Sequence, residues 1–245
     1  MRRFGLIGFP LGHSFSKKYF TEKFLLEGID ARYDLYELKS LEEFAELKVS
    51  ENLCGLNVTI PYKQQIIPFL DEMDETAAEI GAVNVIKFIR NGNDLKLKGY
   101  NSDAIGFLQS IRPYLKPHHN KALILGTGGA SLAFDYILRK LGIETTFVSR
   151  TPAEGQLNYG ELCETVLKEY SIILNASPVG TFPDVERFPD IPYQYLTSRH
   201  LLFDAVYNPA ETLFLQKGKA QGATVLNGEG MLTGQAEAAW KIWNE

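Results

Sequence analysis

The sequence has few cysteines, no long apolar run and no excess of basic residues. It contains 2 cysteines among 245 residues, too few for the disulfide framework of a small secreted domain. No apolar run approaches the roughly 18 residues that a membrane span requires. The 25 Lys and Arg residues against 30 Asp and Glu give a net charge of −5, which argues against binding to a nucleic-acid backbone. We therefore expect a cytoplasmic protein that binds neither nucleic acid nor membrane.

The composition is that of a folded chain with a sizeable core. Hydrophobic residues make up 45% of the sequence and charged residues 22%, as in soluble globular domains. At about 150 residues per domain, the length predicts one or two domains.

The first hundred residues alternate strand-like runs with helical stretches. Apolar or alternating runs predict strands over Phe4–Phe9, Arg32–Leu38 and Leu53–Ile60. Two further runs, Val83–Ile89 and Leu95–Gly99, flank an Asn-Gly-Asn-Asp turn. This pattern predicts a β-hairpin.

A second unit opens near Lys121, after the stretch Pro113–Asn120, which resembles a linker. An apolar strand (Ala122–Leu125) leads through a glycine-rich turn into a helix (Leu132–Leu141). Later strands are expected at Glu144–Ser149, Ser171–Asn175 and Leu201–Val206. This alternation predicts a parallel sheet with right-handed connections.

The glycine-rich turn has the residue types that a dinucleotide site requires. Residues 126–131 read Gly-Thr-Gly-Gly-Ala-Ser. Small residues let the backbone approach a pyrophosphate, and the helix N-terminus supplies free N–H groups and the positive end of its dipole. Ser131 replaces the third glycine of the usual pattern and is still small. The alternative is an ordinary glycine-rich turn, but the strand–turn–helix context favours the dinucleotide.

The end of the next strand bears on the choice of dinucleotide. An NAD site usually ends this strand with Asp or Glu, which binds the ribose hydroxyl. Here the strand ends with Ser149, Arg150 and Thr151. The planar guanidinium of Arg150 suits a 2′-phosphate, so we favour NADP. The alternative is that Arg150 is a solvated surface residue.

The first unit should then hold the substrate, and its loops are rich in hydroxyls. Ser14 and Ser16 lie two residues apart after the first strand. In an extended segment such residues point the same way, so their hydroxyls would converge on one group, such as a carboxylate. The alternative is that Ser16 caps a helix.

Two titratable residues follow predicted strands in this unit. Lys63 is the first titratable group after the strand that ends at Ile60, and Asp103 stands near a helix start. A lysine in a dry cleft can transfer protons near neutral pH. The alternatives are a surface lysine and an aspartate that caps its helix. Asn84 is a polar residue inside an apolar strand and needs a hydrogen-bond partner.

Nine segments carry a resemblance that spans nearly the whole chain. In chain order they are Gly8–Ser16, Asn57–Lys63, Gly81–Asn84, Asn101–Gly106, Gly126–Ala130, Ser149–Thr151, Asn175–Gly180, Asp204–Pro209 and Gly228–Gln235. Through these segments the sequence closely resembles the shikimate dehydrogenase family.

The resemblance implies an α/β fold with two domains. We expect an N-terminal α/β substrate domain with a mostly parallel sheet over residues 1–103 and 227–245. A Rossmann-like NADP-binding domain is expected over residues 104–226. The partners expected are the small-molecule substrate and NADP, with no metal, in a monomer or homodimer.

The resemblance also implies roles for individual residues. Lys63 and Asp103 would be the catalytic pair. Substrate binding is assigned to Ser14, Ser16, Thr59, Asn84, Tyr207 and Gln235. Cofactor binding is assigned to Gly126, Thr127, Gly128, Gly129, Ala130, Ser149, Arg150, Thr151, Val206 and Gly228.

The activity implied is the reversible NADPH-dependent reduction of 3-dehydroshikimate to shikimate in aromatic amino-acid biosynthesis. One alternative is a quinate/shikimate dehydrogenase of broader specificity. Another is a non-catalytic regulator that binds shikimate with the same fold, but the intact Lys63 and Asp103 favour an enzyme. No basic residue lies between Arg150 and Lys168, so the strength of selectivity for NADP over NAD stays open.

Overall fold

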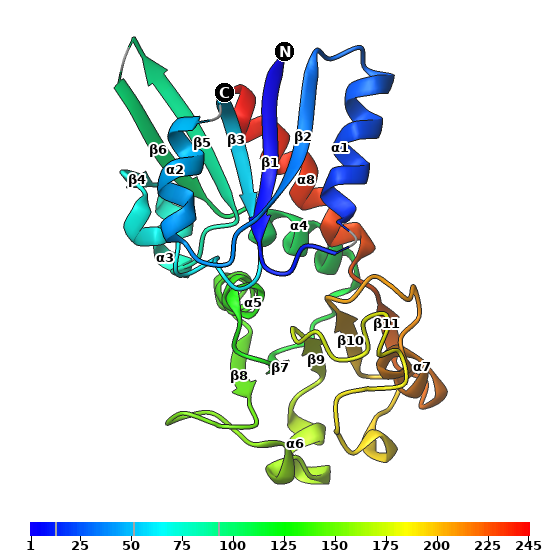
Figure 1. The fold of residues 1–245 in the computed structure, drawn as a ribbon. Coiled ribbons are helices and arrows are strands. Elements are labelled where there is room, and N and C mark those ends of the chain that lie inside the picture. The colour runs from blue at the N-terminus through cyan, green and yellow to red at the C-terminus, as the bar shows by residue number, and fades with distance from the viewer. Residues whose placement is uncertain (13, 51, 93) are drawn as a thin grey trace. The chain divides into compact units, whose positions relative to one another are not determined.

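The chain forms two compact units (Figure 1). The first unit comprises Met1–Ile105 and Gly234–Glu245, and the second comprises Gly106–Thr233. The computed structural model describes the whole sequence apart from three residues, His13, Glu51 and Asn93.

The unit boundaries differ from the expected ones, which were 103/104 and 226/227. The chain passes from one unit to the other inside two helices, α4 (Ser102–Ile111) and α8 (Glu229–Asn244). Just before α8, Gly228 N donates to Val206 O at 3.2 Å, a contact within the second unit. Sequence motifs do not mark these positions, since each helix continues through its boundary.

The first unit is built on a mixed sheet. Its strands are β1 (Arg2–Gly8), β2 (Ala31–Glu37), β3 (Leu53–Val58), β4 (Glu72–Met73), β5 (Val85–Asn91) and β6 (Asp94–Tyr100). Within the described residues the strand order is β2-β1-β3-β5-β6-β4. β1 pairs in parallel with β2 and β3, whereas β5 is antiparallel to β3 and β6. The predicted hairpin is confirmed; its turn includes Asn93, which lies outside the described residues.

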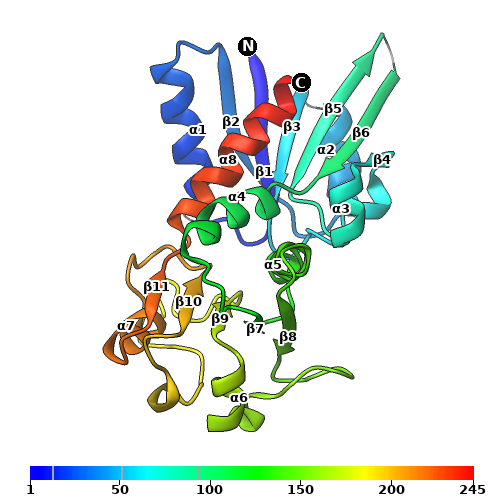
Figure 2. The same ribbon diagram turned by 180° about the vertical axis from the view of Figure 1, so that it is seen from behind.

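Helices cover both faces of this sheet. They are α1 (Phe15–Leu26), α2 (Glu42–Ser50), the short η1 (Ile67–Phe69), α3 (Glu75–Ile80) and parts of α4 and α8. Figures 1 and 2 show α8 and α2 on opposite faces. Because strand side chains alternate, Phe4 of β1 packs with Phe20 of α1 and Trp243 of α8. Ile7 points the other way, into the core that contains Phe44 of α2.

Trp243 fixes the last helix on the first sheet. Its indole is buried, stacks on Phe4 at a centroid distance of 4.8 Å and donates from Nε1 to Ile86 O at 3.1 Å. Gly55 makes room for the ring, since a Cβ there would lie 2.2 Å from Trp243 Nε1. Trp243 also fixes where α8 lies along the sheet, because a buried indole N–H requires an acceptor and finds it at Ile86 O.

The second unit is a parallel sheet. Its strands are β7 (Lys121–Leu125), β8 (Glu144–Val148), β9 (Ile172–Asn175), β10 (Leu201–Asp204) and β11 (Thr224–Leu226). In the part of the chain that the structure describes, their order is β11-β10-β9-β7-β8 and all pairings are parallel. The helices are α5 (Gly129–Lys140), α6 (Glu164–Glu169) and α7 (Leu213–Ala220), with the short η2 (Arg112–Tyr114), η3 (Tyr159–Glu161) and η4 (Tyr193–Tyr195). The predicted two-sheet α/β fold is confirmed.

The stretch Pro113–Asn120 is part of the second unit, so its interpretation as a linker was wrong. His119 is buried; its Nδ1 accepts from Lys116 N at 3.1 Å and its Nε2 lies 3.1 Å from Arg199 O. Burial lowers the pKa of His119. Prolines and histidines suggested a solvated segment, but the imidazole is buried and hydrogen-bonds to backbone groups of two segments.

Every helix in the described part of the chain is too short or too polar to cross a lipid bilayer.

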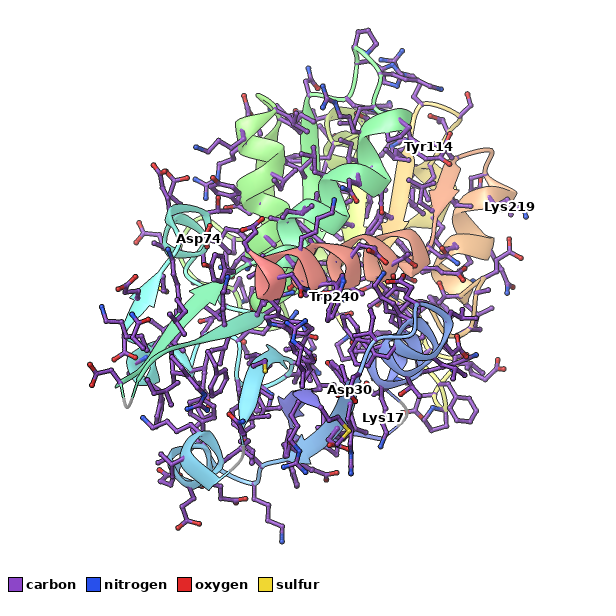
Figure 3. All side chains as sticks on the ribbon, turned by 90° about the horizontal axis from the view of Figure 1, so that it is seen from above. Lys17, Asp30, Asp74, Tyr114, Lys219 and Trp240 are labelled. Carbon is purple, nitrogen blue, oxygen red and sulfur yellow. The ribbon has the colours of Figure 1, made fainter. Side chains whose placement is uncertain are left out.

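We predict that Trp243→Ala lowers the free energy of unfolding by about 3–5 kcal/mol, because the change leaves a large cavity and removes the hydrogen bond to Ile86 O. Urea unfolding followed by circular dichroism measures this loss. Trp240, on the same helix (Figure 3), is only half-buried, so Trp240→Ala should cost less. An equal or larger loss for Trp240→Ala would contradict the anchoring role of Trp243.

Candidate active site and nucleotide site

A buried ion pair joins the two titratable candidates of the first unit. Lys63 Nζ lies 2.5 Å from Asp103 Oδ2. The carboxylate is 1% exposed and the lysine side chain 14%. Such a pair holds the ammonium in one position. Removing either partner would leave the other charge buried and uncompensated. The pair places a proton donor at the surface of the unit with its acidic partner beneath it.

Backbone contacts of the neighbouring segments position both members of the pair. Asn101, and not Asp103, caps α4: its Oδ1 accepts from Ala104 N at 3.2 Å. Asn101 Nδ2 also donates to Ala82 O at 2.9 Å. On the other side, Val83 N donates to Lys63 O at 2.7 Å. The capping alternative for Asp103 is therefore wrong, since its carboxylate faces the lysine.

Asn84 directly precedes β5, rather than lying inside the strand as expected, and it has the hydrogen-bond partners that a buried amide requires. It is buried, and its Oδ1 accepts from Ser102 N at 2.7 Å. Its Nδ2 donates to Ser102 Oγ at 3.0 Å and to Gln235 Oε1 at 3.1 Å. Asn84 thus connects the start of α4 with Gln235 of α8, and it brings together two predicted substrate residues that lie far apart in sequence.

The two serines lie at a helix start and not in an extended segment. Ser14 is the N-cap of α1, and its Oγ accepts from Lys17 N at 3.3 Å. Ser16 lies in the first turn of the helix, because α1 begins at Phe15. The capping role proposed for Ser16 therefore belongs to Ser14. A helix N-terminus favours anions, so the new geometry still suits a carboxylate.

Thr59 follows β3 at the edge where β1 also ends. Its backbone N donates to Ile7 O at 2.9 Å. A Cβ on Gly8 would lie 2.4 Å from Thr59 Cγ2, so the two strand ends are in close contact. Because β1 and β3 are parallel, the segments that carry the serines, Thr59 and Lys63 leave the same edge of the sheet.

A buried hydrogen-bonded pair that the sequence analysis missed, Tyr33 and Asn57, lies in the same unit. Tyr33 Oη donates to Asn57 Oδ1 at 2.7 Å, and Asn57 Nδ2 donates to Asn84 O at 3.3 Å. Burial raises the pKa of Tyr33 far above its usual range, and a hydrogen bond from Ser16 opposes the rise. Asn57 carried the same signal as Asn84, an amide in an apolar strand, and could have been found by it.

In the second unit, the glycine-rich turn has the backbone geometry of an anion site. Gly126 has a φ of +112°, a conformation that favours glycine. Gly128 is the N-cap of α5 and offers no side chain to the first turn. The N–H groups that open a helix have no acceptor within it, although Ser131 N already donates to Gly128 O at 3.0 Å. Ser131 is fully buried and its Oγ donates to Gly128 O at 2.6 Å, so a serine fits where a third glycine is usual.

The turn lies at the switch point of the parallel sheet. The chain passes from β7 to β8 on one side, and β9 pairs with the other side of β7. Ligands of open α/β sheets bind outside the carboxyl ends of the strands at such a point. Ser149, Arg150 and Thr151 follow β8 at this edge; Arg150 is exposed, and Thr151 N donates to Ser149 Oγ at 3.2 Å.

The structure also brings Val206 and Gly228 together. They share the Gly228 N to Val206 O hydrogen bond, and a Cβ on Gly228 would lie 2.4 Å from Ala205 O. Tyr207 follows Val206 in the second unit, whereas the other predicted substrate residues belong to the first unit.

Similarity to known proteins extends over the whole chain. A family model described as the shikimate dehydrogenase substrate binding domain matches residues 6–86. The shikimate dehydrogenase (NADP(+)) of Methanosphaera stadtmanae is 36% identical over 258 residues, which cover 98% of this chain and 90% of that protein. The chain belongs to the shikimate dehydrogenase family. The resemblance found in the sequence is confirmed.

Solved structures of this family have the same fold. The shikimate dehydrogenase from Aquifex aeolicus superimposes with a TM-score of 0.87 at 36% identity, over 99% of this chain and 92% of that one. The shikimate dehydrogenase from Thermus thermophilus, in complex with NADP(H) and shikimate, gives a TM-score of 0.85 at 30% identity, over 99% and 93% of the two chains.

One buried carboxylate near the nucleotide site titrates in an accessible pH range. Burial raises the pKa of Asp204 from 3.8 to about 6, against hydrogen bonds from Thr212, Val206 and Asn175 that lower it. Burial raises the pKa of Tyr193, and the charge of Asp204 adds to the rise. The folded chain therefore binds a proton at Asp204 more tightly than the unfolded chain does.

This shift predicts a pH-dependent difference between the wild type and Asp204→Asn. The stabilising contribution of the protonated carboxyl group is complete below pH 4 and disappears as the pH rises through about 6, a change of about 3 kcal/mol. Urea unfolding of both proteins from pH 4 to pH 8 tests it. A stability difference that does not vary with pH would contradict the raised pKa.

Proposed function

We propose that the chain is a shikimate dehydrogenase, which reversibly reduces 3-dehydroshikimate to shikimate with NADPH. The observation that carries the proposal is the buried Lys63–Asp103 ion pair in a chain of this family. When bound, NADPH supplies the hydride that reduces the ketone carbon of the substrate. The first unit would bind the substrate and the second the cofactor.

The chemistry assigns different roles to the two members of the pair. Hydride addition to a ketone generates negative charge on the oxygen, which a cation nearby stabilises and then protonates. Lys63 Nζ is the donor for that oxygen. Asp103 holds the ammonium in place and accepts a hydrogen bond from a substrate hydroxyl.

The remaining polar residues of the first unit suit a polyhydroxylated carboxylate. Ser14 and Ser16, at the N-terminus of α1, bind the carboxylate with the help of the helix dipole. Thr59, Asn84 and Gln235 hydrogen-bond the ring hydroxyls. The resemblance to the family adds Tyr207 as a further substrate residue.

In this proposal, backbone N–H groups and one cationic side chain, Arg150, hold the cofactor. The small residues 126–130 leave space for the pyrophosphate, and the first N–H groups of α5 donate to it. Arg150, flanked by Ser149 and Thr151, binds the 2′-phosphate. Val206 and Gly228 line the other side of the cofactor site.

We further propose that the protein acts in the cytoplasm, as a monomer or homodimer. Its two free thiols, Cys54 and Cys163, are typical of a reducing compartment.

We predict that Lys63→Met lowers kcat for shikimate oxidation by about 100-fold or more, because the proton donor is lost. The Kd for shikimate, measured by calorimetry, should change little. Lys96, an exposed lysine paired with Glu72, provides the control Lys96→Met. Turnover of the Lys63 variant near that of the control would overturn the catalytic role.

A wild type that binds shikimate without oxidising it would support a regulator, and a higher kcat/KM for quinate would support the broader enzyme.

We predict that Arg150→Ala lowers kcat/KM for NADP by about 10-fold or more and leaves the value for NAD nearly unchanged, since only NADP carries the 2′-phosphate. Arg199→Ala, a change of an exposed arginine in the same unit, is the control. A wild type that prefers NAD, or equal losses for both cofactors, would contradict the assignment.

A further inference from the structure

Asp204 is a buried carboxylate that the reaction does not use. It is the last residue of β10 and is fully buried. Its Oδ1 accepts from Asn175 Nδ2 at 2.9 Å and from Val206 N at 3.0 Å, and its Oδ2 accepts from Thr212 Oγ1 at 2.6 Å. Among the described residues it has no cationic partner. Burying such a charge is costly, so the group is a poor source of stability by itself.

Asn175 extends this network into the loop that follows β9. It is fully buried and pairs in register with Asp204 on the neighbouring strand. Its Oδ1 accepts from Ser177 N at 3.1 Å and Ser177 Oγ at 2.6 Å, and its Nδ2 also lies 3.2 Å from Val179 O. The single side chain therefore shapes the turn over residues 175–179 and links it to Asp204.

The loop that follows β10 is tied to the same carboxylate at two points. Val206 is held by its N–H at the start of the loop, and Thr212 by its hydroxyl at the end. Val206 O in turn accepts from Gly228 N at 3.2 Å. The two loops are also joined directly, since Phe182 N donates to Asn208 O at 3.0 Å.

Both loops lie at the edge of the sheet where the cofactor is proposed to bind. A Cβ on Gly126 would lie 3.4 Å from Ala176 C and from Ser177 N, so the turn after β9 lies against the phosphate turn. Val206 and Tyr207 stand within the other loop. A shift of the network would therefore move backbone that faces both proposed ligands.

We propose that Asp204 is a positioning residue, whose carboxylate fixes the loops after β9 and β10 and so holds Val206 and Tyr207 in the geometry that binds cofactor and substrate. This inference rests on the proposed function.

The geometry favours a carboxylate over an amide of the same size. All three groups that face Asp204 act as donors, and a carboxylate has two oxygens that accept them together. An asparagine at this position would offer one acceptor oxygen and one NH2 group. Turned toward Asn175 and Val206, that NH2 would face two donors. Turned toward Thr212, it would require the hydroxyl to rotate and accept, and in either case the charge-assisted bonds of the carboxylate would be lost.

The test compares Asp204→Asn with Asp135→Asn in the full chain. Asp135 is a second buried aspartate of the same unit, bonded to Thr145 and Arg139, and it controls for general destabilisation. We expect Asp204→Asn to raise the Kd of NADPH, measured by NADPH fluorescence, and to lower kcat/KM for shikimate, each by about tenfold. Asp135→Asn should leave both values within about twofold at the same loss of thermal stability.

A second pair of variants covers the case in which Asp204→Asn does not fold. Thr212→Val removes one donor, and Thr212→Ser retains it. We expect the Kd of NADPH to rise severalfold in the valine variant and to stay at the wild-type value in the serine variant. Unchanged NADPH binding and turnover in Asp204→Asn and Thr212→Val, with an active wild type, would overturn the positioning role alone. A wild type without NADP-linked shikimate oxidation would instead overturn the proposed function.

Discussion

The first unit depends on one buried contact, the ion pair between Lys63 and Asp103. A buried ammonium is tolerated only when an acid compensates it, so the turn after β3 and the start of α4 must meet with little freedom. Asn101 meets this requirement by capping α4 in place of Asp103, which leaves the carboxylate for the lysine. The site's chemistry and the local fold are therefore fixed by the same contact.

Buried amides connect the rest of the site to this pair. Asn84 joins Ser102 of α4 to Gln235 of α8, and Asn57 joins Tyr33 to the backbone of Asn84. The second unit uses a similar arrangement at the end of its sheet, where Asn175 and Asp204 hold two loops. In both units buried polar side chains near strand ends bond to backbone groups and to one another, so that irregular loops acquire a defined shape.

The sequence predicted the residues of this site better than the hydrogen bonds that join them. Lys63, Asn84 and the glycine-rich turn could be found because each interrupts or ends an apolar run. The helix start at Phe15 was missed, because Ser14 and Ser16 suit an extended loop equally well. The contacts of Asn84 with Gln235 and of Asp204 with Asn175 could not be predicted, since the partners lie 151 and 29 residues apart in sequence. Asp204 itself ends an apolar strand, as Asn84 interrupts one, and that signal was available.

A double-mutant cycle on kcat tests most directly whether Lys63 and Asp103 act as one unit. The wild type, Lys63→Met, Asp103→Asn and the double variant are compared in NADP-linked shikimate oxidation. If Asp103 acts through the position of the ammonium, the double variant should be within about threefold of Lys63→Met alone. A loss in the double variant equal to the product of the two single losses would show independent roles and contradict the account.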